Sequence, residues 1–289
     1  MYRSAPNSVH ATARRAAVLF CTAVLMLSGC AGTTPVVRAT PALSTGQIAT
    51  LLASPDRSAA DRSNDVRRKP AQLLEFLAIR PGMVALDLSA GGGYTSELLA
   101  RGVGPDGRVY GQSAPRNPAA VAPAAPEGGG PATVVSAPRP ASVPSPVALA
   151  ERASKPGLGN LVAVVQPFDN PVPAAAGQQL DLVTLMFNYH DLGHMGVDRA
   201  AMNRAVFKAL KPGGTYVIGD HAGRSGTGIS EAGTLHRIEE KFLRSEIEAA
   251  GFVYVAEAGF LRNPADPRDR NTPEPLQPKD DFVMKFSKP

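Results

Sequence analysis

The chain has 289 residues, of which 44% are hydrophobic, so it can bury one large apolar core or two small ones. Its 30 basic and 25 acidic residues give a formal net charge of +5. Three of the basic residues lie in an N-terminal segment that we expect to be removed, which leaves a charge of about +2. This balance is not typical of nucleic-acid-binding proteins, so we expect no nucleic-acid partner.

Residues 1–29 have the form of a signal peptide. Arg14 and Arg15 precede an apolar run at 16–27, which is too short to span a bilayer comfortably. The run ends in Leu27-Ser28-Gly29-Cys30, which resembles the site at which bacterial lipoproteins are cleaved and acylated on the cysteine. This resemblance implies a lipid anchor at Cys30 and a location in the cell envelope facing the periplasm, with Ala31 favouring the outer membrane. An ordinary signal peptide or an uncleaved anchor is the alternative.

Residues 30–46 are rich in alanine, glycine, threonine and proline, and we expect them to form a tether. Cys21 lies inside the predicted signal peptide, so Cys30 is the one cysteine expected in the mature chain. A disulfide, a cysteine zinc site and a cysteine nucleophile are therefore not expected. The predicted domain occupies residues 47–289.

The first part of this domain contains a short predicted helix at 47–53 and a charged segment at 56–70, which we expect to be solvated. Pro70 suits the first turn of a helix at 71–79. Residues 83–88 then predict a buried strand, 89–93 a glycine-rich turn and 94–101 a helix. Glycine lets a ligand approach the backbone closely, and in doubly wound folds a nucleotide-like ligand lies at this crossover.

The rest of the chain alternates between strands and helices. We expect strands at 108–111, 161–165, 179–187, 215–220, 252–256 and 281–286, and helices at 147–153, 198–210 and 239–250. This order predicts one α/β domain whose last two strands pair antiparallel. Nine prolines between 115 and 146 interrupt the pattern, so we expect a disordered insertion at about 113–146. A flexible lid or a partner-binding arm is the alternative for this segment.

From Asp65 to Phe286, without the insertion, these blocks resemble the class I S-adenosylmethionine-dependent methyltransferases. Val84-Ala85-Leu86-Asp87-Leu88-Ser89-Ala90-Gly91-Gly92-Gly93 is similar to the first motif of the family, and Ala209-Leu210-Lys211-Pro212-Gly213-Gly214-Thr215-Tyr216-Val217-Ile218 to its turn before the fifth strand. An exported branch shares Asp-x-x-Arg-x-Pro, here Asp65/Arg68/Pro70, and Asn-x-His-Asp, here residues 188–191. The resemblance implies a Rossmann-like, seven-stranded, mostly parallel sheet with helices on both faces and an antiparallel last strand.

The resemblance also implies S-adenosyl-L-methionine as the cofactor. Its methionine end would lie at the loop 89–93 with Asp87 near its amino group, and its adenine beside Phe168 and Asp169. The full set of cofactor-binding candidates is Asp87, Ser89, Gly91, Gly93, Tyr94, Gln112, Phe168, Asp169 and Asn188. Two of these depart from the family pattern, because Ser89 replaces the first loop glycine and Gln112 replaces the acidic residue that binds the ribose.

Methyl transfer is a direct displacement at a sulfonium carbon, so the protein mainly orients the nucleophile and supplies a base where one is needed. His190, Asp191 and His221 are the catalytic candidates because they follow the fourth and fifth strands, at the edge where doubly wound sheets bind ligands. His190 would be the base or would orient the nucleophile, and His236 would be structural. A hydrogen-bonded loop residue is the alternative for each histidine. We expect the methyl acceptor to be a small molecule or an envelope component.

Two other function classes stay open. His190 and His194 are four residues apart, and imidazoles at this spacing on a helix can bind zinc. Because Gly193 and Gly196 argue against a helix there, and no glutamate follows the first histidine, we expect no metal site. The second class is a methyltransferase fold retained as a ligand-binding or scaffolding lipoprotein, which the changes at Ser89 and Gln112 would fit.

Overall fold

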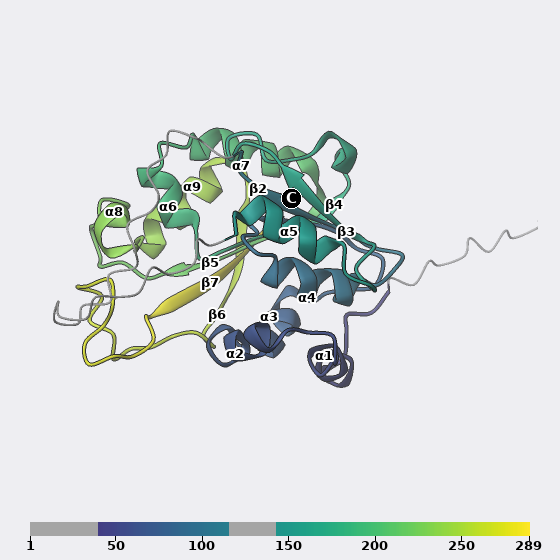
Figure 1. Cartoon of the computed structure of the whole chain (residues 1–289). Coiled ribbons are helices and arrows are strands. Elements are labelled where there is room, and N and C mark those ends of the chain that lie inside the picture. Colours follow the sequence, from purple (N-terminus) through teal and green to yellow (C-terminus); the bar gives the residue numbers. More distant parts are fainter. Residues whose placement is uncertain (1–39, 116–142) are drawn as a thin grey trace, which may run out of the picture. The chain divides into compact units, whose positions relative to one another are not determined.

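A computed structural model of the chain describes residues 40–115 and 143–289. These residues form a seven-stranded sheet with the strand order β3-β2-β1-β4-β5-β7-β6 (Figure 1). Neighbouring strands from β3 to β5 are parallel, whereas β7 is antiparallel to both β5 and the edge strand β6. The α/β class, the mostly parallel sheet and the antiparallel last strand are therefore as predicted.

Most elements lie close to their predicted positions. The strands are β1 (Val84–Leu88), β2 (Arg108–Ser113), β3 (Leu161–Val165), β4 (Leu180–Met186), β5 (Leu210–His221), β6 (Val253–Ala258) and β7 (Asp281–Ser287). The helices are α1 (Thr45–Leu52), α2 (Ala59–Arg68), α3 (Pro70–Leu77), α4 (Tyr94–Val103), α5 (Ser145–Ala153), α6 (Tyr189–His194), α7 (Arg199–Ala209), α8 (Ala232–Leu235) and α9 (Glu240–Ala249), with a 3-10 turn η1 (Ala174–Ala176). The clearest differences from the prediction are α2, α6 and α8, together with the earlier start of β5.

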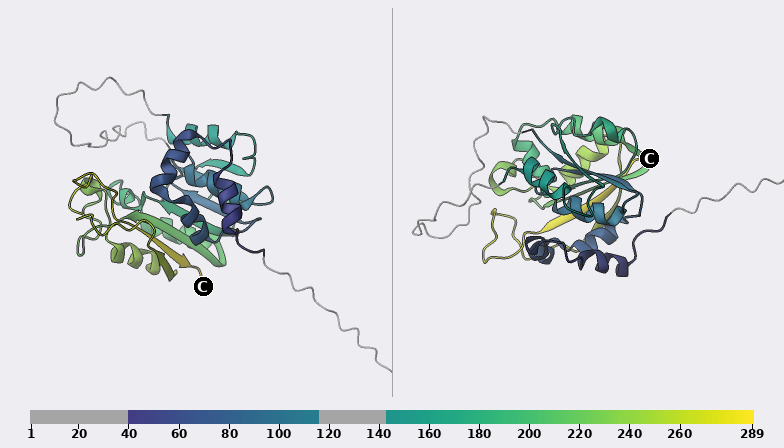
Figure 2. Two further views of the ribbon diagram at one scale, coloured as in Figure 1. Left: turned by 90° about the horizontal axis from the view of Figure 1, so that it is seen from below. Right: turned by 45° about the vertical axis from the view of Figure 1, so that its right-hand side comes forward.

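Side chains along the strands alternate between two apolar cores, because successive residues of a strand point to opposite faces. In β1, Ala85 packs with residues of α1, α3 and α4, whereas Leu86 packs with residues of α6, α7 and α9. Leu182 and Val183 of β4 divide between the same two cores. Figure 2 shows the helices on both sides of the sheet. Both faces are covered, which explains why β4 is apolar along almost its whole length.

We expected the charged segment at 56–70 to be solvated. In the structure its residues 59–68 form the helix α2. The Ser58 side chain caps this helix by accepting a hydrogen bond from the Asp61 N–H at 3.0 Å. Asp61 is buried, at 4% exposure. The inward face of α2 meets charged side chains and a pocket, so it lacks the apolar periodicity by which amphipathic helices are recognised.

The expectation that no helix forms around Gly193 was also wrong, since α6 spans Tyr189–His194. Tyr189 and Leu192 of this helix are fully buried in the core, and this tertiary packing outweighs the low helix propensity of glycine. A Cβ at position 193 would lie 2.4 Å from the Ile229 Cδ1 atom. Glycine is therefore needed there for close packing and does not mark a turn.

The predicted insertion is shorter at both ends, because Ser113 completes β2 and Ser145 begins α5. Its central part, 116–142, lies outside the described residues, as do the predicted signal peptide, Cys30 and most of the tether. Within the described ranges, no helix is long and apolar enough to cross a bilayer.

Candidate active site

A pocket of about 370 Å³ opens at the carboxyl ends of β1 and β4, where the strand order reverses. Its lining comes from the end of β1, the loop 89–92, Met186, α2 and Arg152. Doubly wound sheets bind their ligands at this position, and the volume is within the range of small-molecule sites. A larger hollow of about 1000 Å³ lies against Arg108 and Asn160, at the amino ends of β2 and β3, away from this edge.

The loop from Ser89 to Gly93 exposes bare backbone to this pocket. Ser89, Gly91 and Gly93 have positive φ angles of 52°, 55° and 81°, a conformation that favours glycine. A Cβ on Gly91 would have no atom within 4 Å, so this position is open toward the pocket. A Cβ on Gly93 would lie 2.7 Å from Leu149 Cδ1, so glycine is required there for α5 to pack on the loop.

Ser89 and Gln112, the two departures from the family pattern, contact each other. The Ser89 N–H donates to Gln112 Oε1 at 2.9 Å, and Gln112 Nε2 donates to the Gln166 carbonyl at 2.6 Å. Gln112 is fully buried, so its side chain supports the loop and does not line the pocket. An amide can accept the first bond and donate the second, whereas an ionised carboxylate can only accept. The Ser89 hydroxyl in turn donates to Asn188 Oδ1 at 2.6 Å.

Asp87 is a buried carboxylate of the pocket, at 2% exposure, and unlike Asp61 it forms no ion pair with any described residue. Its two oxygens accept hydrogen bonds from the hydroxyls of Ser96 at 2.6 Å and Thr184 at 2.7 Å. Burial nevertheless outweighs these bonds and raises the pKa of Asp87 to about 6. The carboxylate would therefore gain from a cationic group placed in the pocket.

Arg68 supplies the opposite charge from the last turn of α2. Its guanidinium carbon lies 5.3 Å from the ring centroid of Tyr94 and 4.9 Å from that of Phe187. It forms no hydrogen bond or ion pair with any residue that the structure describes, and its buried Nε atom has no partner. Burial lowers the pKa of Arg68. The pocket thus presents an unpaired cation, a group that binds carboxylates well.

The Asp-x-x-Arg-x-Pro motif gives each of its residues a separate task. Asp65 accepts a hydrogen bond from the Tyr94 hydroxyl at 2.6 Å and forms a bidentate ion pair with Arg57, with both N–O distances 2.7 Å. Arg68 lines the pocket, and Pro70 begins α3. The motif therefore connects α2 to the glycine loop and places a cation beside it.

The predicted cofactor residues fall into three groups. Those that line the pocket are Asp87, Ser89, Gly91 and Tyr94. Gly93 ends the loop, where α5 packs against it, and Gln112 and Asn188 hold the loop through hydrogen bonds with Ser89. Phe168 belongs to the apolar core and Asp169 is exposed, and neither lines this pocket. Sequence reasoning missed Arg68, although its spacing from Asp61 and Asn64 places all three on one face of a helix.

The predicted catalytic residues do come together, along with Asp220 and His236. His190 is buried, with Nδ1 2.6 Å from Asp220 Oδ1 and Nε2 3.1 Å from Asp191 Oδ1. Burial lowers the pKa of His190, but the two carboxylates outweigh burial and raise it to about 9. With this environment alone, His190 holds its proton at neutral pH, so it can orient a partner but is a poor base.

His221 lines a second pocket of about 840 Å³, enclosed by α2 and by the chain between β6 and β7. Its ring lies 5.5 Å from that of Phe187, which also contacts Arg68, so the two pockets are neighbours. His221 Nδ1 lies 2.6 Å from Asp281 Oδ1, yet burial lowers the pKa of His221 well below its usual value. A neutral imidazole can accept a proton, which makes His221 the better base candidate.

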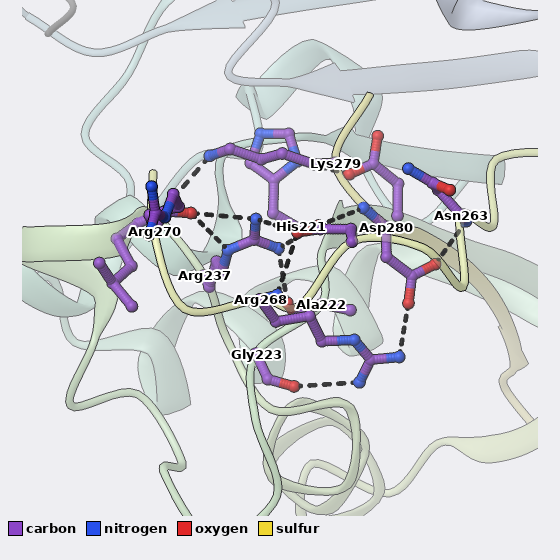
Figure 3. Close-up of polar contacts among 12 residues, drawn as sticks. His221, Ala222, Gly223, Arg237, Asn263, Arg268, Arg270, Lys279 and Asp280 are labelled. Carbon is purple, nitrogen blue, oxygen red and sulfur yellow. Dashed lines mark hydrogen bonds and ion pairs between the residues drawn. The ribbon is translucent and has the colours of Figure 1, made fainter. Parts of the chain in front are cut away.

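The wall of the second pocket is held by the network in Figure 3. Arg237 is fully buried, forms an ion pair with Asp266 at 2.8 Å and donates to the Ala222 carbonyl at 3.0 Å. Arg268 donates to the Gly223 carbonyl at 3.2 Å and pairs with Asp280. These bonds attach the connection between β6 and β7 to the end of β5, so the pocket beside His221 has a fixed wall.

The sequence matches no protein-family model and no curated protein. Solved structures do match, among them a SAM-dependent methyltransferase from Aquifex aeolicus, with a TM-score of 0.51, 16% identity and coverage of 86% of this chain and 100% of that one. The chain has the fold of these methyltransferases. A cyclopropane-fatty-acyl-phospholipid synthase-like protein from Lactobacillus casei also has a TM-score of 0.51, with 13% identity and coverage of 84% of this chain and 100% of that one. At these sequence identities the likeness shows the fold alone.

Proposed function

We propose that the protein is an S-adenosylmethionine-dependent methyltransferase whose cofactor binds in the 370 Å³ pocket. The observation that carries this proposal is the pair of opposite charges beside bare glycine backbone. The methionine end of the cofactor is a zwitterion, so Arg68 would bind its carboxylate and Asp87 its ammonium group. The Asp87 oxygens accept hydrogen bonds from Ser96 and Thr184, and a carboxylate has about four acceptor positions, so capacity for a ligand remains. The fold and the position of the pocket at the strand reversal support the same function.

The acceptor, a small molecule or an envelope component, would approach through the second pocket. The cofactor supplies the methyl group, and His221 would accept the proton of the acceptor as the bond to the methyl carbon forms and the sulfonium bond breaks. Arg67 and Lys69 border this pocket and form no ion pair with any described residue. An acceptor that carries a negative charge would fit these cations best.

Calorimetry with S-adenosylhomocysteine, the demethylated cofactor, tests the proposal. The protein should bind one molecule. Arg68→Met should weaken binding about ten- to a hundredfold, because this factor corresponds to the free energy of a hydrogen bond to a charged group. Arg67→Met is the matched control, because Arg67 precedes Arg68 on α2 but lines the other pocket, and its affinity should change about twofold at most.

A second ligand sharpens the test. 5′-Methylthioadenosine retains the adenosyl group and lacks the amino acid, so Arg68→Met should leave its affinity unchanged. Equal losses for both ligands would place Arg68 in a purely structural role. No binding of S-adenosylhomocysteine by the unaltered protein at millimolar concentration would contradict the enzymatic proposal and leave a fold retained for ligand binding or scaffolding.

We further propose that the protein is a lipoprotein, acylated at Cys30 and held in the outer membrane with its domain facing the periplasm. The support is the sequence: a basic pair, an apolar run and Leu27-Ser28-Gly29-Cys30-Ala31. Acyl chains supply membrane affinity that the domain itself need not provide.

A further inference from the structure

Three side chains converge beside the proposed cofactor pocket without lining it. His190 and Asp191 come from α6, and His236 follows α8 at its C-terminal end. Asp191 Oδ1 lies 3.1 Å from His190 Nε2 and 2.9 Å from His236 Nδ1, and one ligand atom from each residue lies within 4.8 Å of the others. Two imidazole nitrogens therefore face one carboxylate oxygen.

The two separations from Asp191 Oδ1, 3.1 and 2.9 Å, are close to the edges of a metal coordination shell. Zinc bonds to imidazole nitrogen and carboxylate oxygen are about 2.0–2.2 Å long, so neighbouring ligands in a tetrahedral site are about 3.3 Å apart. The third edge, between the two imidazoles, is at most 4.8 Å, so a bound cation would draw the two rings toward each other. Two histidines and one carboxylate leave one position open, as catalytic zinc sites do.

The groups behind these ligands are arranged as an outer shell. His190 Nδ1 lies 2.6 Å from Oδ1 of the fully buried Asp220, whose Oδ2 accepts the His190 N–H at 2.8 Å. Asp220 holds the proton on Nδ1, so a cation would displace only the Nε2 proton that faces Asp191. Metal-binding histidines commonly have such a carboxylate partner on the other ring nitrogen. Asn188 Nδ2 donates to the other Asp191 oxygen at 3.0 Å, which fixes the orientation of the carboxylate.

His236 gives a further indication through its backbone. Its φ angle is 50°, in the left-handed region that side chains other than glycine, asparagine, aspartate and histidine seldom occupy. This conformation directs the imidazole to Asp191 although the side chain is 39% exposed. The cluster is thus closed on the His190 side and accessible on the His236 side.

We propose that His190, Asp191 and His236 bind a divalent transition-metal ion of the Zn²⁺ class, with its open position toward solvent or substrate. The residues are borderline nitrogen and oxygen donors, which suit Zn²⁺ and its neighbours better than Mg²⁺, an ion that prefers oxygen ligands. The expectation of no metal site rested on a pairing of His190 with His194, and the partner of His190 in the folded chain is instead His236. This proposal does not depend on cofactor binding.

The test is calorimetric titration of Zn²⁺ into the purified full chain after removal of metals with a chelator. We expect one ion per chain with a Kd of about 1 µM or tighter and no comparable response to Mg²⁺. His236→Asn should weaken Zn²⁺ binding about a hundredfold or more, because it removes one of three ligands. Asparagine tolerates the left-handed backbone, so the fold should be kept.

His194→Ala is the matched control, because His194 ends the same short helix, is exposed and lies outside the cluster. It should bind Zn²⁺ as tightly as the unaltered protein. Co²⁺ offers a second readout, since its visible absorption depends on coordination geometry and should be lost in His236→Asn and kept in His194→Ala. Absence of Zn²⁺ binding, an equal response to Mg²⁺, or unchanged binding by His236→Asn would overturn the proposal.

Discussion

Asp87 shows how a residue suited to a ligand can lower the stability of the protein without it. Burial raises the pKa of Asp87 to about 6, above the ordinary value of 3.8, so the folded chain holds this proton more tightly than the unfolded chain. Ionisation of Asp87 therefore lowers the free energy of unfolding. This loss begins above about pH 4 and is complete above pH 6. Asp87→Asn should raise the free energy of unfolding at pH 8 by up to about 3 kcal/mol and change it little at pH 4.

Urea unfolding at the two pH values measures this difference, and calorimetry on the same variant should show weaker S-adenosylhomocysteine binding. Asp181→Asn is the control, since Asp181 pairs with Lys211 at the amino end of β4, far along the strand from the pocket. It should lose about 1 kcal/mol at most and keep its ligand affinity. An Asp87→Asn protein that is less stable at pH 8 than the unaltered protein would contradict the electrostatic argument.

The residues of the glycine loop could be identified from the sequence, but their partners could not. The strand, the turn and the following helix are local features, and Asp87, Gly91 and Tyr94 line the pocket at the end of β1. In the sequence, Ser89 and Gln112 are two separate departures from the family's cofactor-binding pattern. Folding brings them into contact across 23 residues of sequence, where each supports the other.

Among the elements, α2 is the helix whose absence from the prediction affected the predicted site most, because it carries Arg68. Apolar periodicity identifies helices that cover a hydrophobic core, and the inward face of α2 covers a pocket and charged groups instead. Polar residues could have indicated this helix, because Asp61, Asn64 and Arg68 recur at helical spacing after the capping residue Ser58. By contrast, α7 and α9 pack apolar faces on the core and could be predicted closely.

Arg152 is the residue that holds α5 on the glycine loop. Its guanidinium pairs with Asp61 at 2.7 Å and with Glu97, and it also donates to the Gly92 carbonyl at 2.5 Å. Arg152→Met would leave two buried carboxylates without this cation, which typically costs 3–5 kcal/mol, although Glu97 retains its pair with Arg101. We expect a loss of about 3 kcal/mol in the free energy of unfolding, measured by chemical denaturation.

Arg244→Met provides the comparison for this prediction. Arg244 forms an exposed ion pair with Glu248 one turn away on α9, and such pairs contribute about 0.3–0.5 kcal/mol. If the two variants lose the same stability, the charged contacts between α2, α4 and α5 do not hold the loop. A large loss for Arg152→Met together with weaker ligand binding would show that α5 positions the loop.

At the scale of the molecule, the alternation of strands and helices was enough to predict one α/β domain with two antiparallel last strands, because each strand is recognisable on its own. The seven-stranded, mostly parallel sheet was implied by the family resemblance. The pocket was not predictable in the same way. Its lining comes from α2, the β1 loop, Arg152 and Met186, which only the strand order and the packing of α5 bring to one place. The convergence of His190 and Asp191 with His236 likewise depends on the path of the chain after β5.

The predicted attachment to the membrane is a property of the whole chain, and two cysteines allow it to be tested. If Cys30 is acylated, cells expressing the protein with labelled palmitate should incorporate label into it, and the protein should sediment with membranes. Cys30→Ser should lose the label and leave the membrane fraction, because serine at this position cannot carry the acyl chains that supply the anchoring. Cys21→Ser, in the middle of the apolar run, should behave as the unaltered protein. A Cys30→Ser protein that keeps the label would disprove acylation at Cys30. If the unaltered protein carries no label and still sediments with membranes, an uncleaved N-terminal segment holds the domain there.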